Sequence, residues 1–473
     1  MLRTKSLIIT LCALLISVPA GGAQSKEETR HLSREILKQL IEINTTDSVG
    51  NVTTSAEAMA KRLRDAGVSD SDIVVAGPND RKKNLVVHFH GTGKRRPVLF
   101  IGHLDVVEAK REDWTTDPFQ FIEKDGYFYG RGTQDMKEGD AILVANFIRL
   151  KKEGFQPDRD FILALTADEE GGNYNGVQWL VAHHRDWIDA EYSINLDGLA
   201  ESQKGHPSLF NIDVSEKVYT DFIFETANPG GHSSVPRRDN AIYSLAAALT
   251  RLQAFSFPLK LNDVSRKYLE YSARRAEGQR SADLLAVAKI PPDPQAVERL
   301  SQDPNYNSVL RTTCVATMLS GGHAPNALPQ VARANVNCRI FPGEEPEEVR
   351  KMLVRVIADP QVSVRFVEQH AADGSVVVPV SVPPSPLNAE LMSAVEKMVS
   401  KMWPGVPVIP DMSQGASDST FLRIGGIPSY VFSGVFLDSD DVRAHGRDER
   451  IRATSFDEGV EFMYQLICEL GAK

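Results

Sequence analysis

Four apolar runs in the first half of the chain end on an acid or a histidine, each with a glycine nearby. They are "VLFIGHLD", "GYFYGRGTQD", "FILALTADEEGG" and "SINLDG", and they carry His103, Asp105, Asp135, Asp168, Glu169, Glu170 and Asp197. The stretch "RAHGRDER" adds His445 near the C-terminus. Because the carboxyl ends of parallel strands share one edge of an α/β sheet, we expect these side chains to converge there.

Imidazoles and carboxylates without cysteine favour zinc, manganese or cobalt at a hydrolytic site, and they argue against a structural zinc held by thiolates. His103 and Asp105 are two apart in an extended segment, so they point to one face. We therefore expect the Asp105 carboxylate to hold the second ring nitrogen of His103. The alternative for this pair is a loop histidine beside a solvated acid.

The elements that must position these residues alternate between strand and helix, which predicts an α/β layered sheet. From about residue 217 the order becomes β-α-β-β-α-β, which is typical of a small ferredoxin-like module inserted into the larger domain. Residues 259–306 interrupt this module with charged, partly helical sequence. We predict a first catalytic segment over 24–216, the inserted module over 217–376 and a second catalytic segment over 377–473.

The 473 residues are 42% hydrophobic, which is enough for a large core, and the formal net charge is −10. No long basic stripe is present, which argues against nucleic acid as a partner. Residues 1–23 have a basic start, an apolar run and small residues at the end, so they predict a cleaved signal peptide. That run is short for a bilayer, and we expect a secreted or periplasmic protein without a stable membrane anchor.

Outside the predicted signal peptide, which contains Cys12, the cysteines are Cys314, Cys338 and Cys468, and three are too few for a disulfide scaffold. Cys314 and Cys338 lie in two strand-like runs, so a bond between them is geometrically allowed in an oxidising compartment. We favour two buried free thiols over this bond.

A family resemblance adds to this interpretation. The motifs "GHLDVV", "GRGTQDMKEG", "ADEEGG", "NLDG", "GGHSSVP", "PNALP" and "AHGRDER", with Trp114 to Phe119, resemble in order those of the M20 family of metallopeptidases and amidohydrolases. The branch most similar contains carboxypeptidase S and the N-acyl-amino-acid hydrolases. The resemblance implies a mixed-sheet catalytic domain of the zinc-peptidase type, with the inserted module serving as a lid and dimerisation domain.

The resemblance also implies a role for each site residue. Asp135 would bridge two divalent ions, most simply zinc, with cobalt or manganese as alternatives. His103 and Asp197 would complete the ligand set of one ion, and Glu170 and His445 would complete the ligand set of the other. Glu169 would be the general base, and a two-metal site would lower the pKa of the attacking water.

Residues of the inserted module would act on the substrate. His232 would stabilise the oxyanion, often from the partner subunit of a homodimer. Arg339 and Asn326 match positions that bind a substrate carboxylate. The alternative for Arg339 is a surface salt bridge. Outside the inserted module, Gly415 in "GASDS" would line the carboxylate pocket through its backbone, with a helix N-terminus as the alternative.

The sequence departs from the family where Glu138 replaces a common glycine and where "PNALP" replaces "NVIP". We predict a hydrolase that cleaves an amide bond next to a free carboxylate, in a small peptide, as a carboxypeptidase or dipeptidase does. An N-acyl-amino-acid deacylase is the alternative. A non-catalytic metal or peptide binder on the same fold is the third candidate.

Overall fold

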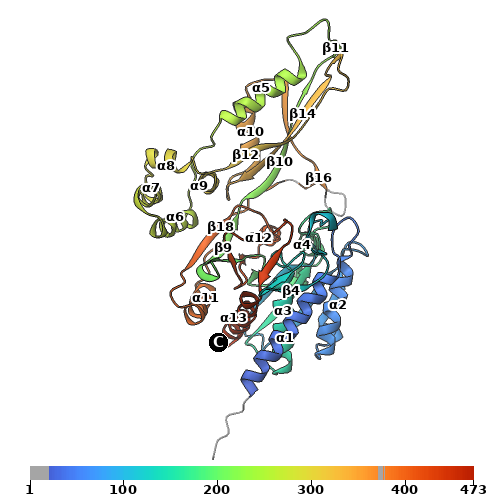
Figure 1. The fold of residues 1–473 in the computed structure, drawn as a ribbon, viewed down its shortest axis with the longest axis vertical. Helices are drawn as coiled ribbons and strands as arrows, with labels where there is room; N and C mark the ends of the chain where they lie inside the picture. Colours follow the sequence, from blue (N-terminus) through green and yellow to red (C-terminus); the bar gives the residue numbers. More distant parts are fainter. Residues whose placement is uncertain (1–20, 371–375, 378, 473) are drawn as a thin grey trace, which may run out of the picture.

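A ten-stranded mixed sheet is the centre of the larger part of the protein (Figure 1). The structure is a computed structural model that describes residues 21–370, 376–377 and 379–472, so the predicted signal peptide lies almost wholly outside the described residues. The strands follow the order β1 (Ile73–Ala76), β2 (Asn84–Phe89), β6 (Arg159–Thr166), β3 (Arg95–His103), β7 (Tyr192–Asn195), β19 (Ser429–Val431), β9 (His206–Glu216), β8 (Ala200–Gln203) and β20 (Phe436–Asp438). In addition, β18 (Val408–Ser413) pairs with β9.

Helices cover both faces of this sheet, which is why a central strand such as β6 is buried at nearly every position. Phe161, Leu163 and Leu165 of β6 belong to the core on one face, whereas Ile162 and Ala164 belong to the core on the other. The first core is closed by α1 (Gly21–Glu42), α2 (Val52–Asp65), α3 (Lys137–Lys152), α11 (Ala389–Met402) and α13 (Ala453–Gly471). The second is closed by α4 (Gly176–His183) and α12 (Ser419–Ile424). The predicted α/β fold class is confirmed.

A second, four-stranded sheet forms the module that we call the lid (Figure 1). Its elements are β10 (Val218–Ala227), α5 (Ala241–Ala254), β12 (Thr313–Gly321), β14 (Val331–Ile340), α10 (Pro346–Ile357) and β15 (Val362–Phe366). The sheet order is β12-β14-β10-β15 and all neighbours are antiparallel. A separate core that includes Phe222, Val336 and Leu353 lies between this sheet and its two helices. The observed order matches the predicted β-α-β-β-α-β pattern.

The insertion within the lid is a block of four helices. These are α6 (Asp263–Arg275), α7 (Gly278–Ala288), α8 (Pro294–Leu300) and α9 (Pro304–Leu310), so the block continues four residues beyond the predicted end at residue 306. Leu269, Leu284 and Leu300 belong to its own small core. The block also contacts the catalytic sheet, because the Tyr271 hydroxyl donates to the Ser208 carbonyl at 3.3 Å.

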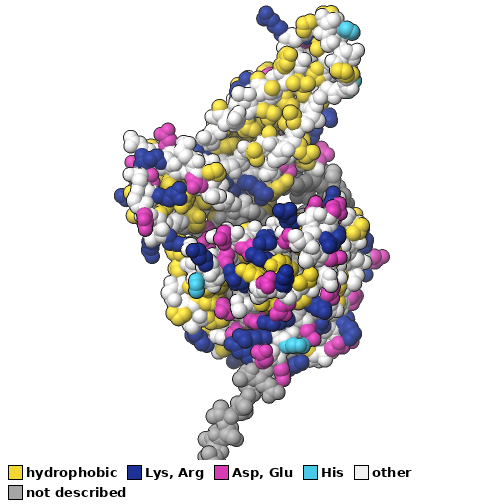
Figure 2. Space-filling model, in the orientation of Figure 1, with side chains coloured by type: hydrophobic (Ala, Val, Ile, Leu, Met, Phe, Trp, Pro, Cys, Tyr) yellow, Lys and Arg dark blue, Asp and Glu magenta, His cyan; other side chains and the backbone are white. Residues whose placement is uncertain are grey.

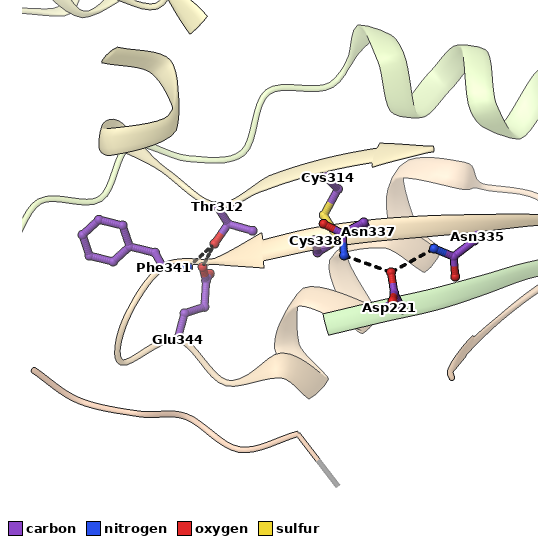
Figure 3. The surroundings of a disulfide bond; sticks show 8 residues. All are labelled: Asp221, Thr312, Cys314, Asn335, Asn337, Cys338, Phe341 and Glu344. Carbon is purple, nitrogen blue, oxygen red and sulfur yellow. Dashed lines mark hydrogen bonds between the residues drawn. A yellow bond between two sulfur atoms is a disulfide. The ribbon is translucent and has the colours of Figure 1, made fainter. Parts of the chain in front are cut away.

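A disulfide joins Cys314 of β12 to Cys338 of β14, and the interpretation of these residues as free thiols is wrong (Figure 3). The two residues are direct cross-strand partners in the register of the β12–β14 pair. That register cannot be read from the sequence, because β12 carries an irregularity between Ala316 and Met318. The bond ties an edge strand to the centre of the lid sheet.

Candidate active site

The carboxyl ends of three neighbouring parallel strands bring most of the candidate residues together. In the register of the sheet, His103 at the end of β3 lies beside Thr166 at the end of β6, and β3 is also paired with β7. The segment that follows β6 carries Glu169 and Glu170, and the segment that follows β7 carries Asp197. The convergence follows from the strand order β6-β3-β7.

Asp135 and His445 reach the same edge from elsewhere in the chain, and Glu449 ties their two segments together. Its buried carboxylate accepts hydrogen bonds from the backbone N–H of Gly132 at 3.1 Å and of Gln134 at 2.6 Å, and it pairs with Arg131 at 2.6 Å. Glu449 lies four residues after His445, so the same side chain fixes the turn before Asp135 and the loop that carries His445.

The site residues form two ligand groups that share Asp135. One contains His103, Asp135 and Asp197, the other contains Asp135, Glu170 and His445, and the ligand atoms within each group lie within 4.8 Å of one another. Oδ1 of Asp135 is 3.1 Å from Nε2 of His103, whereas Oδ2 of Asp135 is 3.0 Å from Nε2 of His445. Each carboxylate oxygen of Asp135 therefore faces a different group, which is the arrangement that a bridging ligand requires.

The electrostatics of the site residues show a shortage of positive charge. Burial raises the pKa of Glu169 and Asp197 well above the usual range. Hydrogen bonds to Asp135 and Glu170 raise the pKa of His445 to about 10. Burial opposes ionisation of Asp135 too, but hydrogen bonds from His103 and His445 lower its pKa overall. Two divalent cations would supply the missing charge, and the imidazole and carboxylate donors suit such ions.

Asp105 acts on the site differently from the prediction. Its carboxylate Oδ1 lies 3.8 Å from Nδ1 of His103, whereas its main-chain oxygen lies 3.1 Å from that nitrogen. The carboxylate instead accepts the backbone N–H groups of Glu169 at 3.1 Å and Glu170 at 3.0 Å. Asp105 therefore orients the His103 ring through its carbonyl and fixes the turn after β6 through its side chain.

Asp168 fixes the same turn from within, with help from Lys82. Asp168 has a positive φ of 57°, and its carboxylate accepts the backbone N–H of Tyr174 at 3.1 Å. The ammonium of the buried Lys82 donates to the Asp168 carboxylate and, at 2.8 Å, to Asp47. Lys82 thus compensates a buried charge directly beside Glu169.

We expect Lys82→Met to lower kcat by about 10- to 100-fold, because loss of the ammonium leaves the Asp168 carboxylate uncompensated and loosens the turn that aims Glu169. Hydrogen exchange over residues 167–172 should rise in this variant. Lys83→Met is the control, since within the described part of the chain the Lys83 ammonium forms an ion pair only with the exposed Asp80, at 3.5 Å. Unchanged exchange in Lys82→Met would contradict the assignment.

The predicted substrate-binding residues lie in two separate places. Arg339 is on β14 at the base of the lid, with its guanidinium 4.7 Å from the centre of the Tyr219 ring. Gly415 is in the exposed loop after β18, where Lys217 donates its backbone N–H to the Ser413 carbonyl at 3.1 Å. His232 is on β11 (Gly231–His232), which pairs with β13 (Ala327–Leu328) directly after Asn326.

Figure 1 places β11 at the far tip of the lid, away from the catalytic sheet. His232 and Asn326 are both exposed there, and the Ser233 N–H donates to the Asn326 carbonyl at 3.1 Å. The chain does not bring these two residues to its own ligand groups.

Three buried residues near the site have no counterpart in the sequence-based prediction: Lys82, Glu449 and Asp418. Asp418 accepts hydrogen bonds from Thr166 and Asn175, both at 2.7 Å, and burial raises its pKa to about 6. Glu449 lies within the motif "AHGRDER", which was a usable signal. Lys82 and Asp418 carry no such signal. Glu138, the unusual residue after "DMK", is fully buried, and burial raises its pKa well above the usual range.

The family of the chain follows from a comparison with known proteins. Residues 99–469 match peptidase family M20/M25/M40, which is more than three quarters of the chain. The chain belongs to this family. It is therefore a hydrolase of the M20 family of peptidases and amidohydrolases, and that family is metal-dependent.

Relatives of this M20 protein include both amidohydrolases and peptidases. The human N-fatty-acyl-amino acid synthase/hydrolase is 28% identical over 458 residues, covering 94% of this chain and 89% of the relative. A probable carboxypeptidase S-like protein of Dictyostelium discoideum is 27% identical over 399 residues, covering 81% of this chain and 74% of the relative. The solved structure of an M20 family metallo-carboxypeptidase from Sulfolobus solfataricus has the same fold, with a TM-score of 0.67 at 16% identity, covering 93% of this chain and 98% of that one.

Proposed function

We propose that the protein is a secreted two-metal hydrolase that cleaves an amide bond next to a free carboxylate, as a carboxypeptidase or dipeptidase does. The observation that supports this most strongly is the pair of ligand groups that share Asp135, with Glu169 beside them. Oε2 of Glu169 lies 4.0 Å from Nε2 of His103, close to one group without belonging to either. Because it is not a metal ligand in this proposal, the Glu169 carboxylate can accept and donate a proton.

His103, Asp135 and Asp197 would hold one ion, and Asp135, Glu170 and His445 the other. Two divalent ions, zinc in this proposal with cobalt or manganese as alternatives, would polarise the scissile carbonyl and lower the pKa of the attacking water. Glu169 takes a proton from the water and passes it to the leaving amine. Asp105 keeps Glu169 and Glu170 in place by holding their backbone N–H groups. The side chain of His445 is 55% exposed, which leaves the site open to substrate.

Arg339 is the residue proposed to bind the substrate carboxylate. Among the described residues no carboxylate forms an ion pair with its guanidinium, which stacks on Tyr219. Burial, together with the nearby Arg339, lowers the pKa of Lys217 to about 8. An unpaired guanidinium in this electropositive surrounding suits a carboxylate better than it suits a structural salt bridge.

We expect Arg339→Ala to raise KM for a free-acid substrate by about 10- to 100-fold, because a charge-assisted, bidentate contact contributes roughly 1.5 to 3 kcal/mol. KM for the amide or ester of the same substrate should hardly change. Arg333→Ala is the matched control, since Arg333 is exposed on the same strand and pairs with Glu225. Equal loss with both substrates would refute the assignment.

An N-acyl-amino-acid deacylase is the second candidate, favoured by the human relative that is named for N-fatty-acyl-amino acids. The deciding experiment is a panel of dipeptides and N-acyl amino acids of rising acyl length, assayed with the mature protein. Release of amino acid from peptides alone would support the peptidase proposal, whereas a clear preference for long acyl chains would support the deacylase. Metal binding without turnover of any substrate in the panel would support the third candidate, a non-catalytic metal or peptide binder.

We further propose that His232 acts in the site of a second copy of the chain. Its position at the tip of the lid supports action in a partner subunit. The edge strand β12 offers an apolar surface for such a partner, since Val315, Met318 and Leu319 are exposed by 60%, 71% and 70%. Figure 2 shows hydrophobic side chains gathered on the face of the lid in view.

Mixing His232→Ala protein with Glu169→Ala protein should restore activity, since each hybrid dimer would contain one site with both residues intact. Subunit exchange is checked by mass spectrometry of differently labelled chains. Complete lack of activity in a mixture with proven exchange would show that His232 does not act across subunits.

Secretion or export to the periplasm is also proposed, on the basis of the signal-like residues 1–23. Over the described part of the chain, no helix combines the length and apolar character needed to cross a membrane.

A further inference from the structure

Two histidines that play no part in the proposed catalysis lie side by side at the opposite edge of the catalytic sheet. His88 is near the end of β2 and His90 follows that strand, so the two rings project to the same face. Because β2 is antiparallel to β6, His88 is paired with Ile162 and His90 comes level with Asp160, near the start of β6. The catalytic residues follow the end of β6, about 20 Å away at 3.3 Å per residue.

Carboxylates bracket this histidine pair. Nε2 of His90 lies 3.4 Å from Oδ1 of Asp72, which is in the short helix η1 (Asp70–Asp72). Nδ1 of His90 lies 3.5 Å from Oδ2 of Asp160. The rings of His88 and His90 are nearly parallel, at 20°, with their centres 6.3 Å apart. His90 therefore lies between two carboxylates, and the His88 ring is stacked beside it.

Three of the four groups line a cavity that has room for an ion and its waters. The cavity has a volume of about 320 Å³, and His88, His90, Asp72 and Lys151 are among the residues that line it. The side chain of His90 is 62% exposed, and those of Asp72 and Asp160 are 24% and 31% exposed, so solvent reaches the His90 ring and both carboxylates.

The charges around the cavity favour a cation. Asp72 and Asp160 flank His90, and Lys151 is the one lysine or arginine among the residues that line the cavity.

We propose that His88 and His90 bind one transition-metal ion, such as zinc, with a flanking aspartate completing the ligand set. Histidines two apart on a strand chelate an ion when each ring turns one nitrogen toward the same point, and imidazole and carboxylate donors suit zinc. This site shares no residue with the two catalytic ligand groups. It therefore adds a third ion per chain that takes no part in amide cleavage.

The test measures bound Zn²⁺ by elemental analysis, after tag-free protein has been equilibrated with micromolar Zn²⁺ and dialysed. Asp135→Ala, which disrupts both catalytic groups, should retain one ion per chain. Adding His88→Gln and His90→Gln to that variant should remove it. The control adds His183→Gln and His184→Gln to Asp135→Ala; His183 is the last residue of α4 and His184 follows it. This variant should keep the ion, which excludes nonspecific binding to histidine.

In the otherwise wild-type chain, His88→Gln with His90→Gln should lose one ion and keep full hydrolytic activity. The proposal is overturned if Asp135→Ala holds no ion, or if the ion survives loss of both histidines. Failure of the catalytic assignment would look different, since it would appear as an Asp135→Ala protein that keeps its full metal content.

Discussion

We expect Glu169→Gln to lower kcat by about 10²- to 10⁴-fold, the range associated with loss of a general base. The amide has nearly the same size as the carboxylate but cannot accept the proton of the attacking water. Glu169 belongs to neither ligand group, so the variant should bind the same number of metal ions as the wild type. Steady-state kinetics and elemental analysis of the same preparation check both statements.

Glu108→Gln is the matched control for this variant. Glu108 lies five residues after His103, and its exposed carboxylate accepts hydrogen bonds from the backbone and side chain of Ser48, both at 2.9 Å. Its loss should leave kcat within about twofold of wild type, as expected for a surface substitution away from the reacting atoms. If Glu169→Gln keeps wild-type turnover, another group is the base.

The second large effect is expected for Asp135→Ala, which should lose both catalytic ions and all measurable turnover. Asp135 is the only residue common to the two ligand groups of the described chain. Its removal also leaves His103 and His445 without the carboxylate that each contacts at 3.1 Å or 3.0 Å. Elemental analysis after dialysis, together with a peptide and acyl-amino-acid assay, gives the result.

Asp197→Ala provides the graded comparison. It disrupts only the group that contains His103, and it leaves Asp135, Glu170 and His445 in place. We expect it to lose one catalytic ion and keep the other. If Asp135→Ala also loses only one catalytic ion, Asp135 is not a bridging ligand.

The placement of the candidate ligands could be predicted because it depends on topology. The runs "VLFIGH" and "FILALT" are apolar at nearly every position, which is typical of strands covered on both faces, and such strands are parallel neighbours in α/β proteins. Acids that directly follow them must then share one edge. The order of elements in the lid was predictable for a similar reason, since its strands and helices alternate clearly in the sequence.

The details that the sequence did not reveal depend on the register or on single side-chain orientations. The Cys314–Cys338 disulfide requires the exact pairing of two strands across a β-bulge. The Asp105 carboxylate turns toward the backbone of Glu169 because two N–H groups there need an acceptor. Lys82 is far from Asp168 in the sequence and matches no motif, so only the folded chain shows that it compensates this buried acid.

The cluster Asp168 to Glu170 contains one feature that the sequence predicts, the need for nearby cations, and one that only the fold shows, the different surroundings of the three carboxylates. Three adjacent carboxylates after a buried strand suggested nearby cations, and the structure places them in three different surroundings. Asp168 contacts Lys82, Glu170 contacts His445, and Glu169 faces the edge of the ligand groups. The repulsion between neighbours is reduced because each carboxylate points in its own direction.

The central claim is a two-ion centre bridged by Asp135, and anomalous diffraction at the zinc edge from crystals of the zinc-loaded protein tests it most directly. At the catalytic edge of the sheet we predict two anomalous peaks about 3.5 to 4 Å apart, one between His103 and Asp197 and one between Glu170 and His445. A single peak at this edge of the sheet, or a pair that does not contact Asp135, would contradict it.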